Sequence, residues 1–122
     1  MLELSSLEHT WIIDVDGTIV KHNGYKIDGY DTLLEGVKEF FYTIDKNDKI
    51  VLLTARTNEH MENLKRFLKD NNIRYDYLLT DMPMGERILI NDEKPSGLKT
   101  AVAVNKKRDA KISLAYHINE EL

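Results

Sequence analysis

Short apolar runs alternate with stretches of helical periodicity along this chain. Apolar runs occupy residues 10–15, 49–54 and 77–79, and the first two stop abruptly at polar or charged residues. Such runs are typical of strands buried in a parallel sheet. Between them, apolar residues recur at helical spacing within 32–46 and within 61–68. The alternation predicts a three-layer α/β fold, in which a Rossmann-like parallel sheet carries helices on both faces.

The segments around these elements are predicted with less regularity. Residues 17–31 mix Gly, Asn, Asp and Tyr without a helical period, which favours a loop or small hairpin flap directly after the first strand. Thr32-x-x-Glu35 resembles a capping box and places the start of the first helix at about residue 32. Two further apolar runs, Ile88–Ile90 and Ala101–Val104, are too short for helices and are predicted to be strands. The tail 105–122 has only a weak helical signal.

Length and composition limit the kinds of protein that this chain can be. With 122 residues and 42% hydrophobic content, residues 1–122 are expected to form a single domain. The net charge of −4 argues against a nucleic-acid backbone as the main partner. No run is long and apolar enough for a membrane helix, and no signal peptide is recognisable. The absence of cysteine excludes disulfides and thiolate sites, and we expect a cytoplasmic protein.

Two carboxylates lie at the end of the first predicted strand. Asp14 and Asp16 are followed by Gly17 and Thr18, and the glycine allows the chain to turn sharply. Both carboxylates can therefore face the crevice beyond the strand ends, where ligands bind in open α/β sheets. One carboxylate can attack a phosphate ester while the other transfers protons. An anionic nucleophile approaching an anionic phosphate requires a cation, and Mg²⁺ suits oxygen ligands of both groups.

Two later strands are predicted to bring further polar groups to the same crevice. Thr54 ends the second strand with a hydroxyl that can orient a phosphoryl oxygen, and Ala55 and Arg56 follow it as candidate substrate-binding residues. Asp92, after the run 88–90, is the expected third metal ligand, and the Asn91 amide can orient a ligand or water. With Gly17 and Thr18, these residues complete the predicted site.

The chain resembles the haloacid dehalogenase superfamily, whose phosphatases carry the signature DxDGT after the first strand. By this resemblance Asp14 is the nucleophile that forms an aspartyl-phosphate, and Asp16 is the general acid and base. Asp14, the main-chain carbonyl of Asp16, and Asp92 would hold Mg²⁺, and Thr54 would be the hydroxyl of the second motif. The run from Arg87 to Pro95 is similar to that of small members linked to surface-polysaccharide and sugar-phosphate metabolism.

The sequence departs from this family in two respects. It has no insertion long enough for a cap domain, so it resembles the minimal, capless type. It also lacks the usual lysine or arginine of the third motif, since no basic residue lies within 81–85. We rank Lys94 first as its replacement, because it follows Asp92 by only two residues, Lys99 second, and Arg56, which lies just after Thr54, third. Arg87 opens a predicted strand at the far end from the crevice and is expected to act structurally.

The resulting hypothesis is a magnesium-dependent phosphatase that acts on a small phosphorylated metabolite, with a sugar phosphate as the first choice. The crevice of a capless domain stays open unless the flap or a second copy of the chain covers it. Two other functions remain open: a phosphoryl-accepting module of the receiver type, and a catalytically silent binding domain. In the flap, Tyr25 and Tyr30 can either cover a substrate or close a local cluster.

Overall fold

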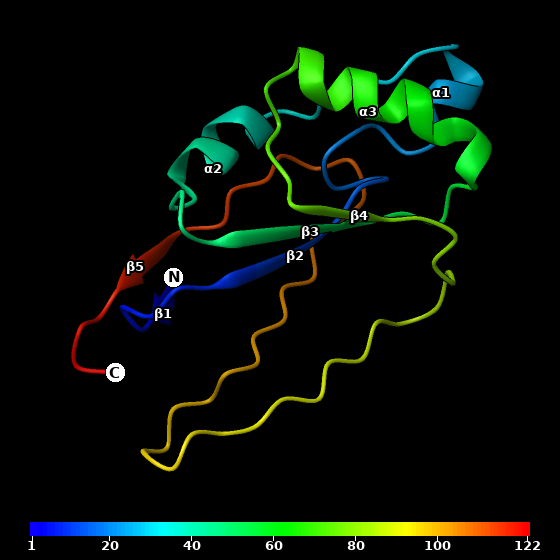
Figure 1. Cartoon of the computed structure of the whole chain (residues 1–122). Helices are drawn as coiled ribbons and strands as arrows, with labels where there is room; N and C mark the ends of the chain where they lie inside the picture. Colours follow the sequence, from blue (N-terminus) through cyan, green and yellow to red (C-terminus); the bar gives the residue numbers. More distant parts are fainter.

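Five short strands and three α-helices form the regular structure of residues 1–122, all of which are described by a computed structural model (Figure 1). The elements follow one another in this order: β1 Leu2–Leu4, β2 Thr10–Asp14, α1 Gly24–Ile27, α2 Val37–Thr43, β3 Lys49–Leu53, the 3₁₀ turn η1 Asn58–His60, α3 Met61–Asp70, β4 Tyr77–Leu79 and β5 Tyr116–Ile118. None of the helices is both long and apolar enough to span a bilayer.

The strands form two parallel sheets. The larger has the order β2-β3-β4, with Asp14 opposite Leu53 and Leu53 opposite Leu79. Their carboxyl ends therefore meet at one edge. The smaller sheet pairs β1 with β5 and so joins the two ends of the chain. The predicted parallel α/β fold without a cap domain is confirmed.

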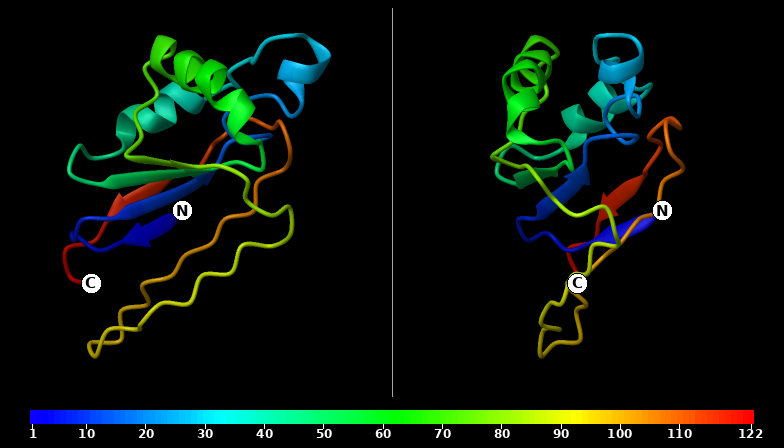
Figure 2. Two further views of the ribbon diagram at one scale, coloured as in Figure 1. Left: turned by 45° about the vertical axis from the view of Figure 1, so that its right-hand side comes forward. Right: turned by 90° about the vertical axis from the view of Figure 1, so that its right-hand side faces the viewer.

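The helices cover one face of the larger sheet. All three lie on the same side of β2, β3 and β4 in the views of Figures 1 and 2. Along β2 and β3, Ile13, Ile50 and Leu52 are buried toward this side, whereas Ile12 is 51% exposed. The structure thus differs from the three-layer prediction, since the second face carries no helical layer. Continuous apolar runs do not reveal that one face stays partly open.

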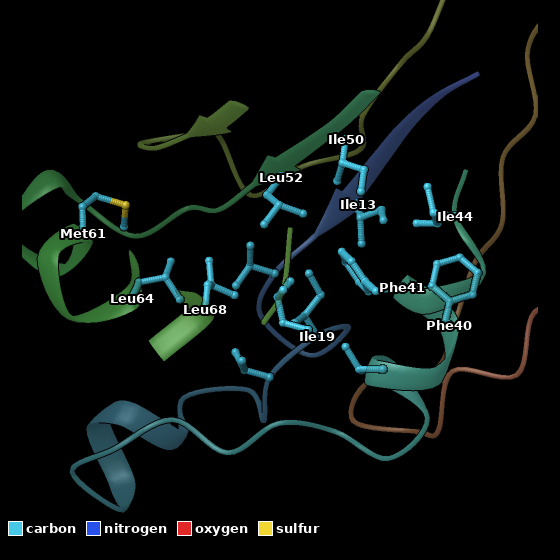
Figure 3. Packing of buried hydrophobic residues seen from close by; sticks show 14 residues of the cluster. Ile13, Ile19, Phe40, Phe41, Ile44, Ile50, Leu52, Met61, Leu64 and Leu68 are labelled. Carbon is cyan, nitrogen blue, oxygen red and sulfur yellow. The ribbon is translucent and has the colours of Figure 1, made fainter. Parts of the chain in front are cut away.

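The core lies between this sheet and its helices (Figure 3). Ile50 and Leu52 of β3 are fully buried, as are Leu64 and Leu68 of α3, which come from one stripe of that helix. Burying a side chain of this size contributes roughly 1.5–3 kcal/mol. The remaining members of the cluster are Ile13, Val15, Ile19, Val20, Val37, Phe40, Phe41, Ile44, Met61 and Ile73. This core holds the carboxyl ends of β2 and β3 in place.

The first long helix is shorter than predicted. α2 begins at Val37, after Gly36 in a left-handed conformation with φ of +83°, and not at residue 32. Residues 32–34 instead run beside the flap, where the Thr32 carbonyl accepts from Lys21 N–H and Leu34 N–H donates to Ile19. The apparent capping box was therefore a misleading local signal. The flap itself contains the single turn α1.

Residues 82–104 form an extended arm that projects away from the sheet and helices in every view (Figures 1 and 2). The strands predicted at 88–90 and 101–104 are absent, and Ile88 and Ile90 are 84% and 90% exposed. The hydrogen bonds within the arm lie near its tip, where Lys94 N–H donates to the Leu98 carbonyl at 2.9 Å. Apolar character alone predicted strands here, but a strand also requires a partner backbone.

Candidate active site at the strand ends

β2 ends at Asp14 and continues directly into the loop that carries Asp16. Val15 N–H donates to the Leu53 carbonyl at 2.9 Å, so pairing with β3 extends one residue beyond the strand. Gly17 then adopts a φ of +85°, which favours glycine, and the chain turns away. Val15 and Ile19 are fully buried on either side of this turn. The core therefore fixes the loop at both of its ends.

Asp14 holds two partners and remains accessible. Its Oδ1 accepts a hydrogen bond from Arg87 Nη1 at 2.8 Å, and its Oδ2 accepts one from the Thr18 hydroxyl at 3.2 Å. The Asp14 side chain is 35% exposed and that of Arg87 is 40% exposed. A carboxylate at a strand end, open to solvent and beside a cation, can approach an anionic substrate.

Asp16 is held more firmly than Asp14. Its Oδ2 accepts from the Thr54 hydroxyl at 2.7 Å, and its Oδ1 accepts from Arg56 Nε at 2.9 Å. Arg56 Nη2 lies 2.8 Å from the same Oδ1. Thr54 is fully buried, and its hydroxyl also accepts from Arg56 N–H at 3.1 Å. Both Asp16 oxygens are engaged, but Oδ2 keeps a free lone pair for a proton.

Arg56 connects Asp16 to the flap. Its Nη1 and Nη2 donate to the two oxygens of Asp31 at 3.0 and 2.7 Å, and its guanidinium lies 3.8 Å from the Tyr25 ring centroid. Burial by itself lowers the pKa of Arg56, but hydrogen bonds and charge from Asp31 and Asp16 outweigh burial and raise it. Arg56 therefore stays charged, and its side chain faces carboxylates instead of open solvent.

Free main-chain donors lie next to these side chains. Neither Asp16 N–H nor Ala55 N–H donates a hydrogen bond within the chain. By contrast, the N–H groups of Gly17 and Thr18 are used inside the turn, at 2.8 and 3.3 Å from main-chain carbonyls. Among the predicted substrate-binding residues, Ala55 thus offers a free donor for a phosphoryl oxygen, whereas Gly17 and Thr18 shape the loop.

The tail contacts the loop after Asp16, although the sequence analysis predicted no role for the tail. Lys106 Nζ donates to three main-chain carbonyls, those of Gly17 at 3.1 Å, Lys107 at 2.9 Å and Ala110 at 2.6 Å. Asp109 N–H also donates to the Gly17 carbonyl, at 2.9 Å. Burial lowers the pKa of Lys106, while the nearby carboxylates of Asp109 and Asp14 oppose this effect. We call residues 106–110 the tail clasp.

The arm carries the predicted residues that the structure does not bring to the site. Asp92 and Lys94 are exposed near its tip, and Asn91 Nδ2 donates to the Thr100 hydroxyl at 2.8 Å. Lys99 is exposed on the same arm. Their predicted positions assumed that residues 88–90 pair with the sheet, which they do not. The structure therefore gives neither Asp92 as a third ligand nor Lys94 as the missing cation.

The residues present fit a magnesium ion with few protein ligands. No group of three or more His, Cys, Asp or Glu side chains is arranged to hold a metal ion. Mg²⁺, however, often binds through one or two carboxylates and completes its shell with water and substrate phosphate. Asp14 provides an accessible carboxylate, and the main-chain carbonyl of Asp16 accepts no hydrogen bond. Both are hard oxygen donors of the required kind.

A cavity of about 560 Å³ lies between the flap and α3. Arg56 and Asp31 contribute to its wall, and Tyr25 and Tyr30 line it from the flap. The two tyrosines differ: Tyr25 stacks on Arg56, whereas Tyr30 is 66% exposed. The volume of this cavity is in the range of small-molecule sites.

No family model and no curated protein matches this chain. Among solved structures, the chain is similar to one chain of the structure of the Pnkp1/Rnl/Hen1 complex, with 30% sequence identity and a TM-score of 0.53. The match covers 68% of this chain, and this chain spans 31% of the length of the other. The similarity supports the α/β fold described above.

Proposed function

We propose that this protein is a magnesium-dependent phosphatase that hydrolyses a phosphate monoester through an aspartyl-phosphate at Asp14. The observation that carries the proposal is the convergence, at one edge of the sheet, of Asp14, Asp16 and the free N–H of Ala55, with Arg87 beside Asp14. The resemblance of the segment from Asp14 to Thr18 to haloacid dehalogenase phosphatases also supports it.

In the first step, an Asp14 oxygen attacks phosphorus while the bond from phosphorus to the leaving oxygen breaks. Asp16 gives a proton from Oδ2 to that oxygen, and an alcohol departs. In this mechanism, Arg87 beside Asp14 and the free N–H of Ala55 would stabilise the negative charge on the phosphoryl oxygens. An ion at Asp14 and the Asp16 carbonyl would supply further charge compensation for the phosphate.

In the second step, Asp16 accepts a proton from water as the water oxygen attacks phosphorus. The bond from phosphorus to the Asp14 oxygen breaks, and inorganic phosphate leaves with both aspartates restored. Thr54 and Arg56 keep the Asp16 carboxylate in one place throughout both steps. Each aspartate thus has a separate role, set by its partners.

For the substrate we propose a small phosphorylated metabolite, with a sugar phosphate as the first choice, in the cytoplasm. The cavity between the flap and α3 is large enough for the part of the substrate that does not react. Because there is no cap domain, we expect the flap or a second copy of the chain to cover the crevice during the reaction.

The first prediction is that Asp14→Asn abolishes turnover and leaves the fold intact, because the amide cannot act as the nucleophile. Hydrolysis of p-nitrophenyl phosphate and of a panel of sugar phosphates, with Mg²⁺ and with EDTA, measures turnover, and thermal unfolding checks the fold. Trapping of acid-stable, hydroxylamine-sensitive phosphate on the wild-type protein should fail in the variant. Metal-dependent turnover by a folded Asp14→Asn protein would contradict the mechanism.

The same assay separates the other two functions. A receiver-type module would take up about one equivalent of phosphoryl group without catalytic turnover, as expected when only the first of the two steps is fast. A silent binding domain would show neither labelling nor turnover. Repeated turnover that disappears with Asp14→Asn therefore favours the phosphatase over both.

A further inference from the structure

The last residue of the flap forms the most buried ion pair in the molecule. The side chains of Asp31 and Arg56 are only 6% and 3% exposed, and two hydrogen bonds join them. A buried charge is costly unless it is paired and hydrogen-bonded, so each of these two groups depends on the other. Yet the only hydrogen-bond partner of the Asp31 side chain is Arg56.

All the guanidinium nitrogens of Arg56 are engaged by carboxylates. Nη1 donates to Asp31, Nε lies against Asp16, and Nη2 lies within 2.8 Å of both. The Tyr25 ring stacks on the guanidinium at 3.8 Å and adds a third contact. Only one N–H of Arg56, on Nη1, is thus left without a carboxylate partner, which argues that Arg56 acts mainly by holding other groups.

We propose that Asp31 is a positioning residue, which acts through Arg56 to fix the Asp16 carboxylate for proton transfer. The inference rests on the proposed phosphatase function. Asp31 and Tyr25 fix the guanidinium from the flap side, and Arg56 in turn fixes Asp16 Oδ1. Oδ2 then faces one way only, with Thr54 on one lone pair and the other free for the proton. The flap thereby sets the geometry of proton transfer.

The dependence of the rate on the leaving group tests this role. p-Nitrophenolate leaves as a stable anion, whereas the alkoxide of glycerol 2-phosphate has to be protonated as it departs. Asp31→Asn should therefore lower kcat for glycerol 2-phosphate by about tenfold or more, a part of the 10²–10⁴-fold that a general acid contributes. It should lower kcat for p-nitrophenyl phosphate much less. Asp31→Glu, which keeps the carboxylate, should recover part of the kcat lost with glycerol 2-phosphate.

Asp28→Asn is the matched control, because it removes a flap carboxylate that pairs with Lys21 at 2.9 Å on the surface, away from Arg56. It should leave both rates unchanged. Equal losses on the two substrates in Asp31→Asn, or no loss, would overturn the proposal. Thermal unfolding of both variants identifies any general destabilisation, and Asp31→Glu retains the charge if Asp31→Asn folds poorly.

A second measurement does not depend on turnover. In wild-type protein and in Asp28→Asn, the Arg56 Nε–H should exchange slowly with solvent in ¹⁵N NMR spectra, and in Asp31→Asn it should exchange faster. Unchanged exchange in Asp31→Asn would overturn the link between Asp31 and Arg56. Absence of turnover in the wild-type protein would instead contradict the proposed phosphatase, and the exchange rates would still decide whether Asp31 holds Arg56.

Discussion

We propose that the ion pair between Arg87 and Asp14 matters for the reaction more than for stability. Their side chains are 40% and 35% exposed, and ion pairs at such positions contribute about 0–1 kcal/mol to folding. In the proposed reaction, however, a cation that already lies beside Asp14 does not have to be brought to the phosphate. Arg87 is therefore our replacement for the basic residue that is missing from 81–85.

Arg87→Ala should lower kcat by about 10²-fold, as removal of one charge-stabilising donor does in other active sites. The free energy of unfolding should change little, because the ion pair is accessible to solvent. Lys94→Ala is the matched control, since Lys94 lies on the arm away from Asp14, and its kcat should stay near that of wild type. A large loss of kcat in Lys94→Ala together with near wild-type kcat in Arg87→Ala would mean that Lys94, and not Arg87, supplies the missing cation.

The sequence predicts those site residues whose position is determined by their immediate neighbours. Asp14 and Asp16 were located by the turn that follows them, and Thr54 by the end of its own apolar run. Asp31 and Lys106 gave no such signal, because their roles depend on contacts with Arg56 and Gly17, which are distant in sequence. A basic run in the tail and an aspartate in a flap are ordinary features of a soluble surface.

At the scale of elements, the entry to α2 depends on a glycine. Gly36 has φ of +83°, and a Cβ there would lie 2.6 Å from the Ile112 carbonyl oxygen of the tail. Gly29 in the flap has the same φ but open space around it. The two positions therefore share a left-handed backbone conformation, which disfavours any other residue, and differ in steric contact.

Gly29→Ala should reduce the free energy of unfolding by about 1 kcal/mol, the cost of a left-handed conformation for alanine. Gly36→Ala should cost about 1–3 kcal/mol more, because the tail has to move away from α2. Chemical denaturation of both variants measures the difference. Equal losses in the two variants would mean that the tail does not pack against Gly36.

The elements that the sequence predicted correctly are those with strong local signals. β2, β3 and β4 are apolar runs, and α3 has a single apolar stripe. β1 and β5 are three residues each and pair across more than a hundred positions, so no local pattern marks them. The prediction of strands in the arm was wrong for the opposite reason: its apolar runs have strand-like composition but no backbone partner in the sheet.

At the scale of the whole molecule, the tail clasp ties the end of the chain to the loop after Asp16. Lys106→Met should destabilise the protein by about 1–3 kcal/mol, since the Ala110 carbonyl loses its donor and those of Gly17 and Lys107 each lose one of two donors. It should also reduce kcat, because the Gly17 turn loses a support. Lys107→Met, which removes an exposed neighbouring ammonium, is the control and should change stability by less than about 0.5 kcal/mol.

Denaturant unfolding measures the stability of the two lysine variants, and hydrolysis of p-nitrophenyl phosphate measures their kcat. Equal behaviour of the two lysine variants would show that the ammonium of Lys106 is dispensable. A loss of stability without a loss of kcat would confine the clasp to folding and separate it from the site.

The clasp also has a consequence for the order in which the protein matures during synthesis. The strands β2, β3 and β4 and the helices between them are complete once residue 79 has left the ribosome, and such a unit can begin to fold at once. Lys106 and Asp109 emerge much later, so their hydrogen bonds to the Gly17 carbonyl form last. A ribosome-bound chain would thus fold its core before the candidate site is complete. Turnover of a substrate would begin only after the tail has bound the loop that follows Asp16.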